Sequence, residues 1–255
     1  TPTRCTTCRG EYLRLQGYGT QRVAEVVASS FPGAALARID RDIAGRRGAV
    51  EKIPQSFERH EVDVLIGTQM IAKGHDFPKV TLVGVIDADV GLGLPDFRSA
   101  ERTFALLTQV AGRAGRGDLP GEVLLQTHNP KHYAIELAQT QDYDAFFDRE
   151  MEFRRTMGYP PQEAMINVLF RGPAEDEVAK NARAIAHRLK AKLGPGVLGP
   201  SPSPLSKVRD EYRYQVVARG PRARIREAVQ GALLAQFGAL RFPGVSVDVD
   251  PVSLM

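Results

Sequence analysis

The segment Gln109-Val-Ala-Gly-Arg-Ala-Gly-Arg116 places two arginines three residues apart, with only small residues between them. It closes an apolar-periodic stretch that predicts a helix over residues 99–114. Small residues let a backbone approach a partner closely, and guanidinium groups bind phosphate oxygens as a fork. Arginines held in this way stabilise the charge that develops during phosphoryl transfer. The alternative is a glycine-broken helix end, where cations only complement the helix dipole.

A second motif lies upstream, in Val64-Leu-Ile-Gly-Thr-Gln-Met-Ile-Ala-Lys-Gly-His-Asp-Phe77. Residues 62–66 are apolar except for Asp63 and end at Gly67, which predicts a short buried strand. Open α/β sheets bind ligands just beyond the carboxyl ends of their strands. The segment after this strand therefore holds our candidate ligand contacts, which are Thr68, Gln69, Lys73, Gly74 and Asp76.

Strand and helix patterns alternate through residues 18–128. Strands are predicted at 36–40, 62–66, 80–86 and 123–127, and helices at 21–31, 48–59 and 99–114. Alternation of this kind gives an α/β fold with a parallel, doubly wound sheet. Pro54 falls inside the second helix, which is therefore expected to start late or to kink.

The rest of the chain is predicted to form a connector at 129–161 and a smaller domain at 162–255. The connector is helical and acidic and ends at Tyr159-Pro-Pro161. Strands are predicted at 164–170, 212–218 and 245–249, and helices at 176–193 and 222–237. Two such β-α-β units predict an α/β sandwich with its helices on one sheet face. Residues 194–207 are rich in Pro, Gly and Ser and are predicted to be an irregular loop.

The composition indicates a soluble protein. With 255 residues, 43% of them hydrophobic, the chain can bury a sizeable core. No apolar run approaches the roughly 20 residues that a membrane span needs, and no secretory signal opens the chain. Two cysteines cannot build a disulfide framework. We therefore expect a cytoplasmic monomer without membrane contact.

Positive charge is concentrated in residues 178–226. This segment carries twelve basic and two acidic side chains, whereas residues 136–177 carry four basic and ten acidic ones. A basic surface attracts phosphate groups, although the charges on the helix predicted at 176–193 are equally explained as its solvated face. Lys207, Arg209 and Arg213 are mixed with tyrosines and are candidate DNA contacts; the alternative is an edge strand with exposed charges.

Arg222, Arg224 and Arg226 stand at the start of the last predicted helix. A helix N-terminus already favours anions, and the added arginines indicate an anionic partner, either DNA phosphate or an acidic protein tail. We select Arg222 and Arg226 as partner-binding residues.

Cys5-Thr-Thr-Cys8 is half of a zinc-binding pattern. Tetrahedral Zn²⁺ needs two further ligands, and the chain contains no other cysteine. Residues 1–17 are therefore expected to end a metal module whose other ligands lie elsewhere, or to form an empty site. A thioredoxin-like redox role would need a surrounding βαβ frame, which the sequence does not predict.

The two long motifs resemble motifs V and VI of superfamily 2 helicases. Two sequence segments are similar to those of the primosomal replication-restart DNA helicases. They are GTQMIAKGHDF at 67–77 and DFRSAERTFALLTQVAGRAGR at 96–116. The resemblance covers nearly the whole chain, from the cysteine pair through residues 17–21 and 37–41 to Asp248-Val-Asp-Pro251. It implies that residues 18–128 form the second RecA-like lobe of a helicase motor.

The resemblance also implies residue roles. Gln109, Arg113 and Arg116 would face ATP bound on the other lobe, with Arg113 as the arginine finger. Gly74 would let the backbone close on the nucleotide, and Asp76 would contact its ribose. Thr68 and Gln69 would hold the DNA backbone without reading sequence, and Lys73 could serve either ligand.

Further partners follow from the same resemblance. Mg²⁺ would be held mainly by the other lobe, and paired Cys-x-x-Cys units between the lobes would complete the zinc site of Cys5 and Cys8. The domain at 162–255 would contact branched DNA, single-stranded DNA, primosome proteins and the acidic tail of single-stranded-DNA-binding protein. Arg222 would belong to the pocket for that tail.

Two residue patterns invite other interpretations. His75 is taken as a packing or interlobe residue, because no nucleophile pattern accompanies it. Asp87, Asp89 and Asp96 could be mistaken for a metal triad, but we interpret them as residues of a loop at a strand's end.

The sequence contains neither a Gly-x-x-x-x-Gly-Lys-Ser/Thr phosphate cradle nor an Asp-Glu-x-His box. The chain alone is therefore expected not to hydrolyse ATP, and to be the C-terminal part of a longer enzyme or a protein that lost its first lobe. Three hypotheses remain: half of a replication-restart helicase, a non-catalytic DNA- and protein-binding module, and a superfamily 2 translocase on RNA. The intact arginines favour the first, and the cysteine pair and the terminal Asp-Val-Asp-Pro argue against the third.

Overall fold

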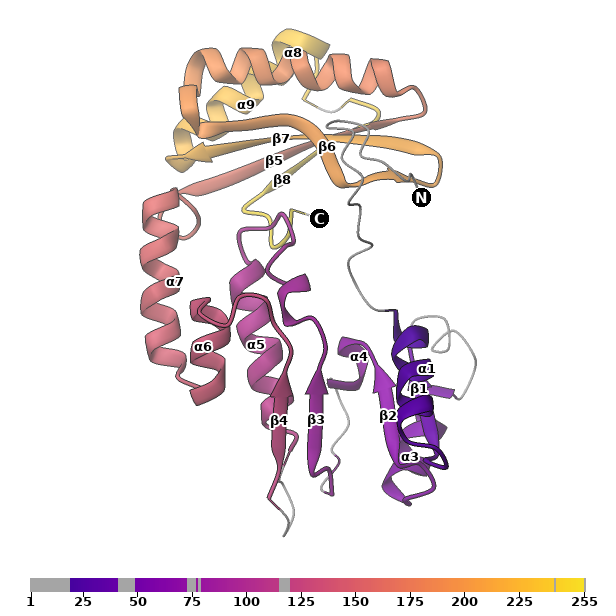
Figure 1. The fold of residues 1–255 in the computed structure, drawn as a ribbon. Coiled ribbons are helices and arrows are strands. Elements are labelled where there is room, and N and C mark those ends of the chain that lie inside the picture. The colour runs from indigo at the N-terminus through magenta and orange to yellow at the C-terminus, as the bar shows by residue number, and fades with distance from the viewer. Residues whose placement is uncertain are drawn as a thin grey trace, which may run out of the picture. The chain divides into compact units, whose positions relative to one another are not determined.

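The computed structural model describes residues 19–40, 49–72, 77, 79–114, 120–240 and 242–254. The chain divides into two compact units (Figure 1). Unit 1 consists of residues 1–92 and 102–142, and unit 2 of residues 93–101 and 143–255. The expected metal module at 1–17 lies outside the described residues.

Unit 1 alternates helices and strands, as the sequence predicts. Its elements are α1 (Thr20–Ser30), β1 (Leu36–Ile39), α3 (Ala49–Glu58), β2 (Val64–Gly67), α4 (Gln69–Ala72), β3 (Leu82–Val85), η1 (Ala88–Val90), α5 (Ser99–Ala111, whose first turn belongs to unit 2), β4 (Glu122–Leu125) and α6 (Tyr133–Thr140). Pro54 lies inside α3 and does not end it.

The strands of unit 1 pair in parallel. β1 pairs with β2, and β3 with β4. Within the described residues these are two separate two-stranded sheets and not one continuous, doubly wound sheet. Parallel pairing thus agrees with the prediction, while the strand arrangement of a complete doubly wound sheet stays a prediction.

Unit 2 contains a four-stranded antiparallel sheet. Its elements after α7 (Tyr143–Met157) are β5 (Ala164–Gly172), α8 (Glu175–Leu193), η2 (Gly194–Gly196), β6 (Val197–Val208), β7 (Glu211–Gly220), α9 (Arg222–Phe237) and β8 (Val245–Val249). The strands lie in the order β6-β7-β5-β8, and every neighbouring pair is antiparallel. This β-α-β-β-α-β order is that of a ferredoxin-like, or split βαβ, domain.

The prediction of an irregular loop at 194–207 is wrong, because β6 occupies most of this range. Pro200, Pro202 and Pro204 suggested a loop, yet β6 is an edge strand, where a missing N–H does not break the ladder. Two register shifts interrupt its pairing with β7. The extra strand turns the two predicted β-α-β units into one antiparallel sheet.

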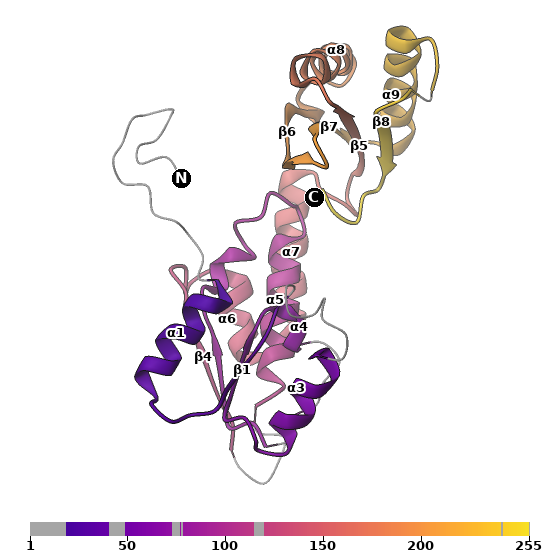
Figure 2. The ribbon, with the colours of Figure 1, turned by 90° about the vertical axis from the view of Figure 1, so that its right-hand side faces the viewer.

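Helices α8 and α9 cover one face of this sheet (Figures 1 and 2). The predicted stripe of α8 is buried there, at Val178, Ala182, Ile185 and Leu189. Every second residue of β5 meets it, namely Ile166, Val168 and Phe170. Burial of alternate strand residues against a helical stripe follows from periods of two and 3.6 residues.

Among the described residues of unit 2, side chains cover the opposite face only at one end. Phe97, which precedes α5, packs there with Met165, Val217 and Leu254, and Tyr159 joins them from the margin. Asp96 fixes this corner, because its carboxylate accepts hydrogen bonds from the Ser253 hydroxyl and from the backbone N–H of Leu254.

A buried guanidinium ties α7 to the first turn of α5 within unit 2. Arg154 donates to Glu150 at 2.7 Å, to Glu101 at 2.6 Å and to the carbonyl of Pro160 at 3.2 Å. Arg98 also donates to Glu101, through Nε at 3.1 Å. This hydrogen bond, with the help of Arg154 and against the effect of burial, lowers the pKa of the Glu101 carboxyl.

Arg154→Met should destabilise unit 2. The substitution keeps much of the side-chain volume but removes the charge that Glu150 and Glu101 share, and breaking a buried ion pair costs about 3 kcal/mol or more. Urea unfolding followed by circular dichroism measures this loss. The neighbouring exposed Arg155→Met is the control and should change the free energy of unfolding little; equal values for both variants would contradict the expectation.

Candidate functional site

Two of the predicted DNA contacts lie at the carboxyl end of the β1–β2 pair. β2 ends at Gly67, and a Cβ there would stand 2.3 Å from the carbonyl oxygen of Ile39, so only glycine fits. Thr68 and Gln69 follow directly and are exposed. Their position is the edge at which open α/β sheets bind ligands.

Three further candidates from this motif are Lys73, Gly74 and Asp76. They lie outside the described residues, as does His75. Their predicted roles stay predictions.

A polar cluster at the end of β1 was not selected from the sequence. Asp40 is 8% exposed, accepts a hydrogen bond from the Thr20 hydroxyl at 2.8 Å and forms an ion pair with Arg38, whose Nε lies 2.9 Å from the carboxylate. These contacts fix the start of α1 against the end of β1, next to the strand that carries Thr68. The sequence did contain a signal for this cluster, because Thr20 and Asp40 lie in the segments 17–21 and 37–41 that carry the family resemblance.

The arginine motif follows the end of α5. Gln109 is exposed on its last turn, and Arg113 is half-buried two residues past its last residue. The N–H groups of Arg113 and Ala114 bond to carbonyls three residues back, which tightens the helix end. A cation at this helix end complements the partial negative charge of the last helix carbonyls. Arg116 lies outside the described residues.

Asp87 and Asp89 lie in the loop that follows β3, and the side chain of Asp89 holds this loop in place. The carboxylate of Asp89 accepts from the N–H of His128 at 2.7 Å, from the Thr127 hydroxyl and from the Asn129 amide. Burial raises the pKa of Asp89, but these hydrogen bonds outweigh it, so that the pKa is lowered. Among the described residues, no group of three or more His, Cys, Asp or Glu side chains is arranged to hold a metal ion.

The predicted DNA contacts of unit 2 lie around the β6–β7 hairpin. Arg209 and Asp210 form its turn, with φ values of 51° and 62°, and Arg209 is exposed. Nζ of Lys207 lies 3.5 Å from the Asp210 carboxylate and 4.8 Å from the ring centre of Tyr212. The hairpin therefore presents cations at its tip, one of them over an aromatic ring.

Arg213 lies on the other face of the sheet from Tyr212 and Tyr214, because successive strand residues alternate. Its partner across the sheet is Arg171 of β5. No sequence pattern indicates Arg171, because only the β5–β7 register places it there.

Arg222 has an internal partner. It begins α9, and its guanidinium lies 2.7 Å from the carboxylate of Asp250, in the terminal Asp-Val-Asp-Pro segment. The sequence predicted that a partner supplies the anion at this helix start, but the fold supplies a carboxylate of its own. Arg226 is exposed one turn later.

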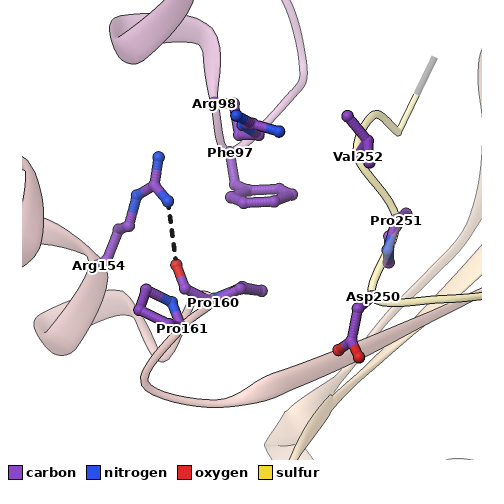
Figure 3. Close-up of a pocket in the computed structure, with 8 residues that line it drawn as sticks. All are labelled: Phe97, Arg98, Arg154, Pro160, Pro161, Asp250, Pro251 and Val252. Carbon is purple, nitrogen blue, oxygen red and sulfur yellow. Dashed lines mark hydrogen bonds between the residues drawn. The ribbon is translucent and has the colours of Figure 1, made fainter.

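Figure 3 shows a small pocket in unit 2, beside the Arg154 cluster. The Phe97 ring lies 5.5 Å from the Arg154 guanidinium, and the prolines supply much of the rest of its wall. Its lining residues are Phe97, Arg98, Arg154, Pro160, Pro161, Asp250, Pro251 and Val252. The charged groups at this pocket are already paired with Glu101, Glu150 and Arg222, so we assign it no ligand.

Two family models match the chain. Residues 27–118 match the helicase conserved C-terminal domain, and residues 155–252 match the primosomal protein N C-terminal domain. Replication restart protein PriA of Bacillus subtilis (strain 168) is 44% identical over 262 residues, which cover 100% of this chain and 32% of the relative. PriA of Treponema pallidum (strain Nichols) is 41% identical, over 100% of this chain and 39% of the relative.

This chain is related to the C-terminal part of PriA. The resemblance drawn from residues 67–77 and 96–116 is thereby confirmed. The chain spans about a third of the length of these curated relatives. None of its described helices combines the length and apolar character that crossing a membrane requires.

The two matched segments divide the candidate residues. Thr68, Gln69, Gln109, Arg113 and Arg116 fall in the helicase match, while Lys207, Arg209, Arg213, Arg222 and Arg226 fall in the match to the primosomal protein N C-terminal domain. Cys5 and Cys8 precede both matches and lie outside the described residues. The zinc site therefore stays a prediction.

Asp89→Asn should lower the thermal unfolding midpoint of this PriA relative at neutral pH. Because the folded-state pKa of Asp89 is lowered, its contribution is present above the unfolded-state pKa of about 3.9 and is lost as pH falls through the folded value. The difference between wild type and variant should therefore shrink on acidification from pH 7 to pH 3. The exposed Glu58→Gln is the control; a difference that grows at low pH would contradict this assignment.

Proposed function

We propose that this chain is the C-terminal part of an ATP-dependent DNA helicase that recognises branched DNA at stalled forks and restarts replication by assembling the primosome. The observation that carries the proposal is Arg113, half-buried past the end of α5 within the segment that matches a helicase domain. The name of the relatives, replication restart protein PriA, supports the biological role.

In this proposal Arg113 is the arginine finger for ATP bound on another lobe. Arg116 helps to hold the γ-phosphate, and Gln109 faces the same group. Gly74 lets the backbone approach the nucleotide, and Asp76 contacts its ribose. The sequence lacks a phosphate cradle, so the Mg²⁺ ligands and the cradle belong to that other lobe, and this chain alone is inactive.

DNA would be held through its backbone in both units. Thr68, Gln69 and Lys73 would contact it from the strand end of unit 1, and Lys207, Arg209 and Arg213 from unit 2. The exposed position of Thr68 and Gln69, and of the hairpin cations, supports this assignment. Such contacts position a motor without reading sequence.

Protein partners would bind unit 2. Arg222 and Arg226 would receive the acidic tail of single-stranded-DNA-binding protein, with Asp250 as the internal carboxylate that such a tail has to displace from Arg222. Cys5 and Cys8 would hold Zn²⁺ together with two ligands from outside this sequence. The protein would act as a cytoplasmic monomer.

The test is ATP hydrolysis by the longer protein that also carries the ATP-binding lobe, with and without forked DNA. Arg113→Ala should lower the DNA-stimulated rate by about 10³-fold and leave nucleotide binding intact, because a finger acts on the transition state. The exposed Arg59→Ala is the matched control. An unchanged rate in Arg113→Ala, or no hydrolysis by wild type, would instead favour a non-catalytic DNA- and protein-binding module.

A further inference from the structure

Two arginines stand directly opposite each other on the sheet of unit 2. The β5–β7 register pairs Arg171 with Arg213, next to the pair Phe170 and Tyr214. Phe170 is buried under the helices, so alternation directs both arginines to the opposite, open face. Side chains paired in this way have Cβ atoms about 5 Å apart.

This arrangement is unfavourable in the free protein. Like charges placed directly opposite each other on a sheet are destabilising. Arg98, Arg154 and Arg222 of unit 2 each have a carboxylate partner. Within the described part of the chain, neither Arg171 nor Arg213 has an ion pair or a side-chain hydrogen bond. Glu211 is on the same face but two residues along β7, about 7 Å away.

The backbone beneath the pair is fixed. β5 lies between β7 and β8. The N–H of Arg171 also donates to the carbonyl of Gly244 at 2.7 Å. Gly244 has a φ of 77°, and a Cβ there would stand 2.3 Å from the Arg171 carbonyl oxygen, so this close approach requires glycine. The two guanidinium groups are thus attached to a rigid platform.

The surrounding open face favours a phosphate over a base. The same-face neighbours of the pair are Leu169, Gln215, Ser201 and Ser246. The aromatic residues of these strand segments, Phe170, Tyr212 and Tyr214, occupy the other face by alternation. The described strand segments therefore offer hydrogen-bond donors around the pair on the open face, but no ring on which a base could stack.

We propose that Arg171 and Arg213 jointly bind one phosphate group of a nucleic-acid backbone on the open face of the unit 2 sheet. Two guanidinium forks on one phosphate form charge-assisted hydrogen bonds, and the anion removes the repulsion between them. The contact carries no base information. This inference deepens the proposed function by adding Arg171 and the binding mode, and it rests on that function only in taking DNA as the ligand.

The first test is binding of the chain to single-stranded and duplex DNA over a series of salt concentrations. Arg171→Ala and Arg213→Ala should each weaken both complexes by about tenfold and lower the slope of log affinity against log salt by about one. If one phosphate is shared, the double variant should lose little more than either single variant. Arg188→Ala, on the exposed side of α8, removes the same charge and should have little effect.

Four outcomes of this test would overturn the proposal. They are no DNA binding by wild type, an effect of Arg171→Ala no larger than that of Arg188→Ala, fully additive losses in the double variant, and competition by poly-glutamate as efficient as by unlabelled DNA. The last would assign the pair to an acidic protein segment. The ATPase test of Arg113 concerns the other unit, so failure of the motor proposal and failure of this site are distinguishable.

The second test is thermal unfolding without DNA. Arg171→Gln removes the repulsion and should raise the unfolding midpoint at low salt, and the difference should fade at high salt, where charges are screened. DNA should then stabilise wild type more than Arg171→Gln. A lower midpoint for the variant at low salt would mean that Arg171 already has a stabilising partner, and would overturn the proposal.

Discussion

The guanidinium of Arg154 is the contact on which the arrangement of unit 2 depends. It joins α7, the first turn of α5 and the turn at Pro160 through three hydrogen bonds. A buried arginine is costly unless its donors are satisfied, and here they are satisfied only when these three segments meet.

Periodicity predicted those elements that bury one face. The α8 stripe and the alternation of β5 and β7 mark a helical and a strand surface that meet in one core. β6 shows no such periodicity. Its prolines are typical of a loop, and its strand conformation depends on pairing with β7. Propensity is a weak guide for an edge strand, whose outer side makes no ladder. With the missed strand included, the two predicted β-α-β units become one antiparallel sheet.

The candidate functional residues also differ in whether a local sequence pattern can indicate them. Residue types at a strand end and at a helix end are local features, so the sequence could indicate Thr68, Gln69 and Arg113. The contacts Arg222–Asp250 and Arg171–Arg213 join residues far apart in the chain. They depend on strand register and on where β8 packs, and a one-residue slip would move Arg171 to the other face. No local pattern contains that information.

These pairings change how the basic segment 178–226 is interpreted. Its excess charge suggested a continuous phosphate-binding surface, but Lys207 and Arg222 have carboxylate partners, and Arg219 and Arg224 donate to carbonyls. A cation that already has a partner contributes less to binding, because an anion must displace the partner or bind beside it. The other cations of this segment have no carboxylate partner among the described residues, and most of them lie on exposed positions of α8 and α9. Arg213 differs from these, because the β5–β7 register places it directly opposite Arg171, a second arginine that the described part of the fold does not neutralise.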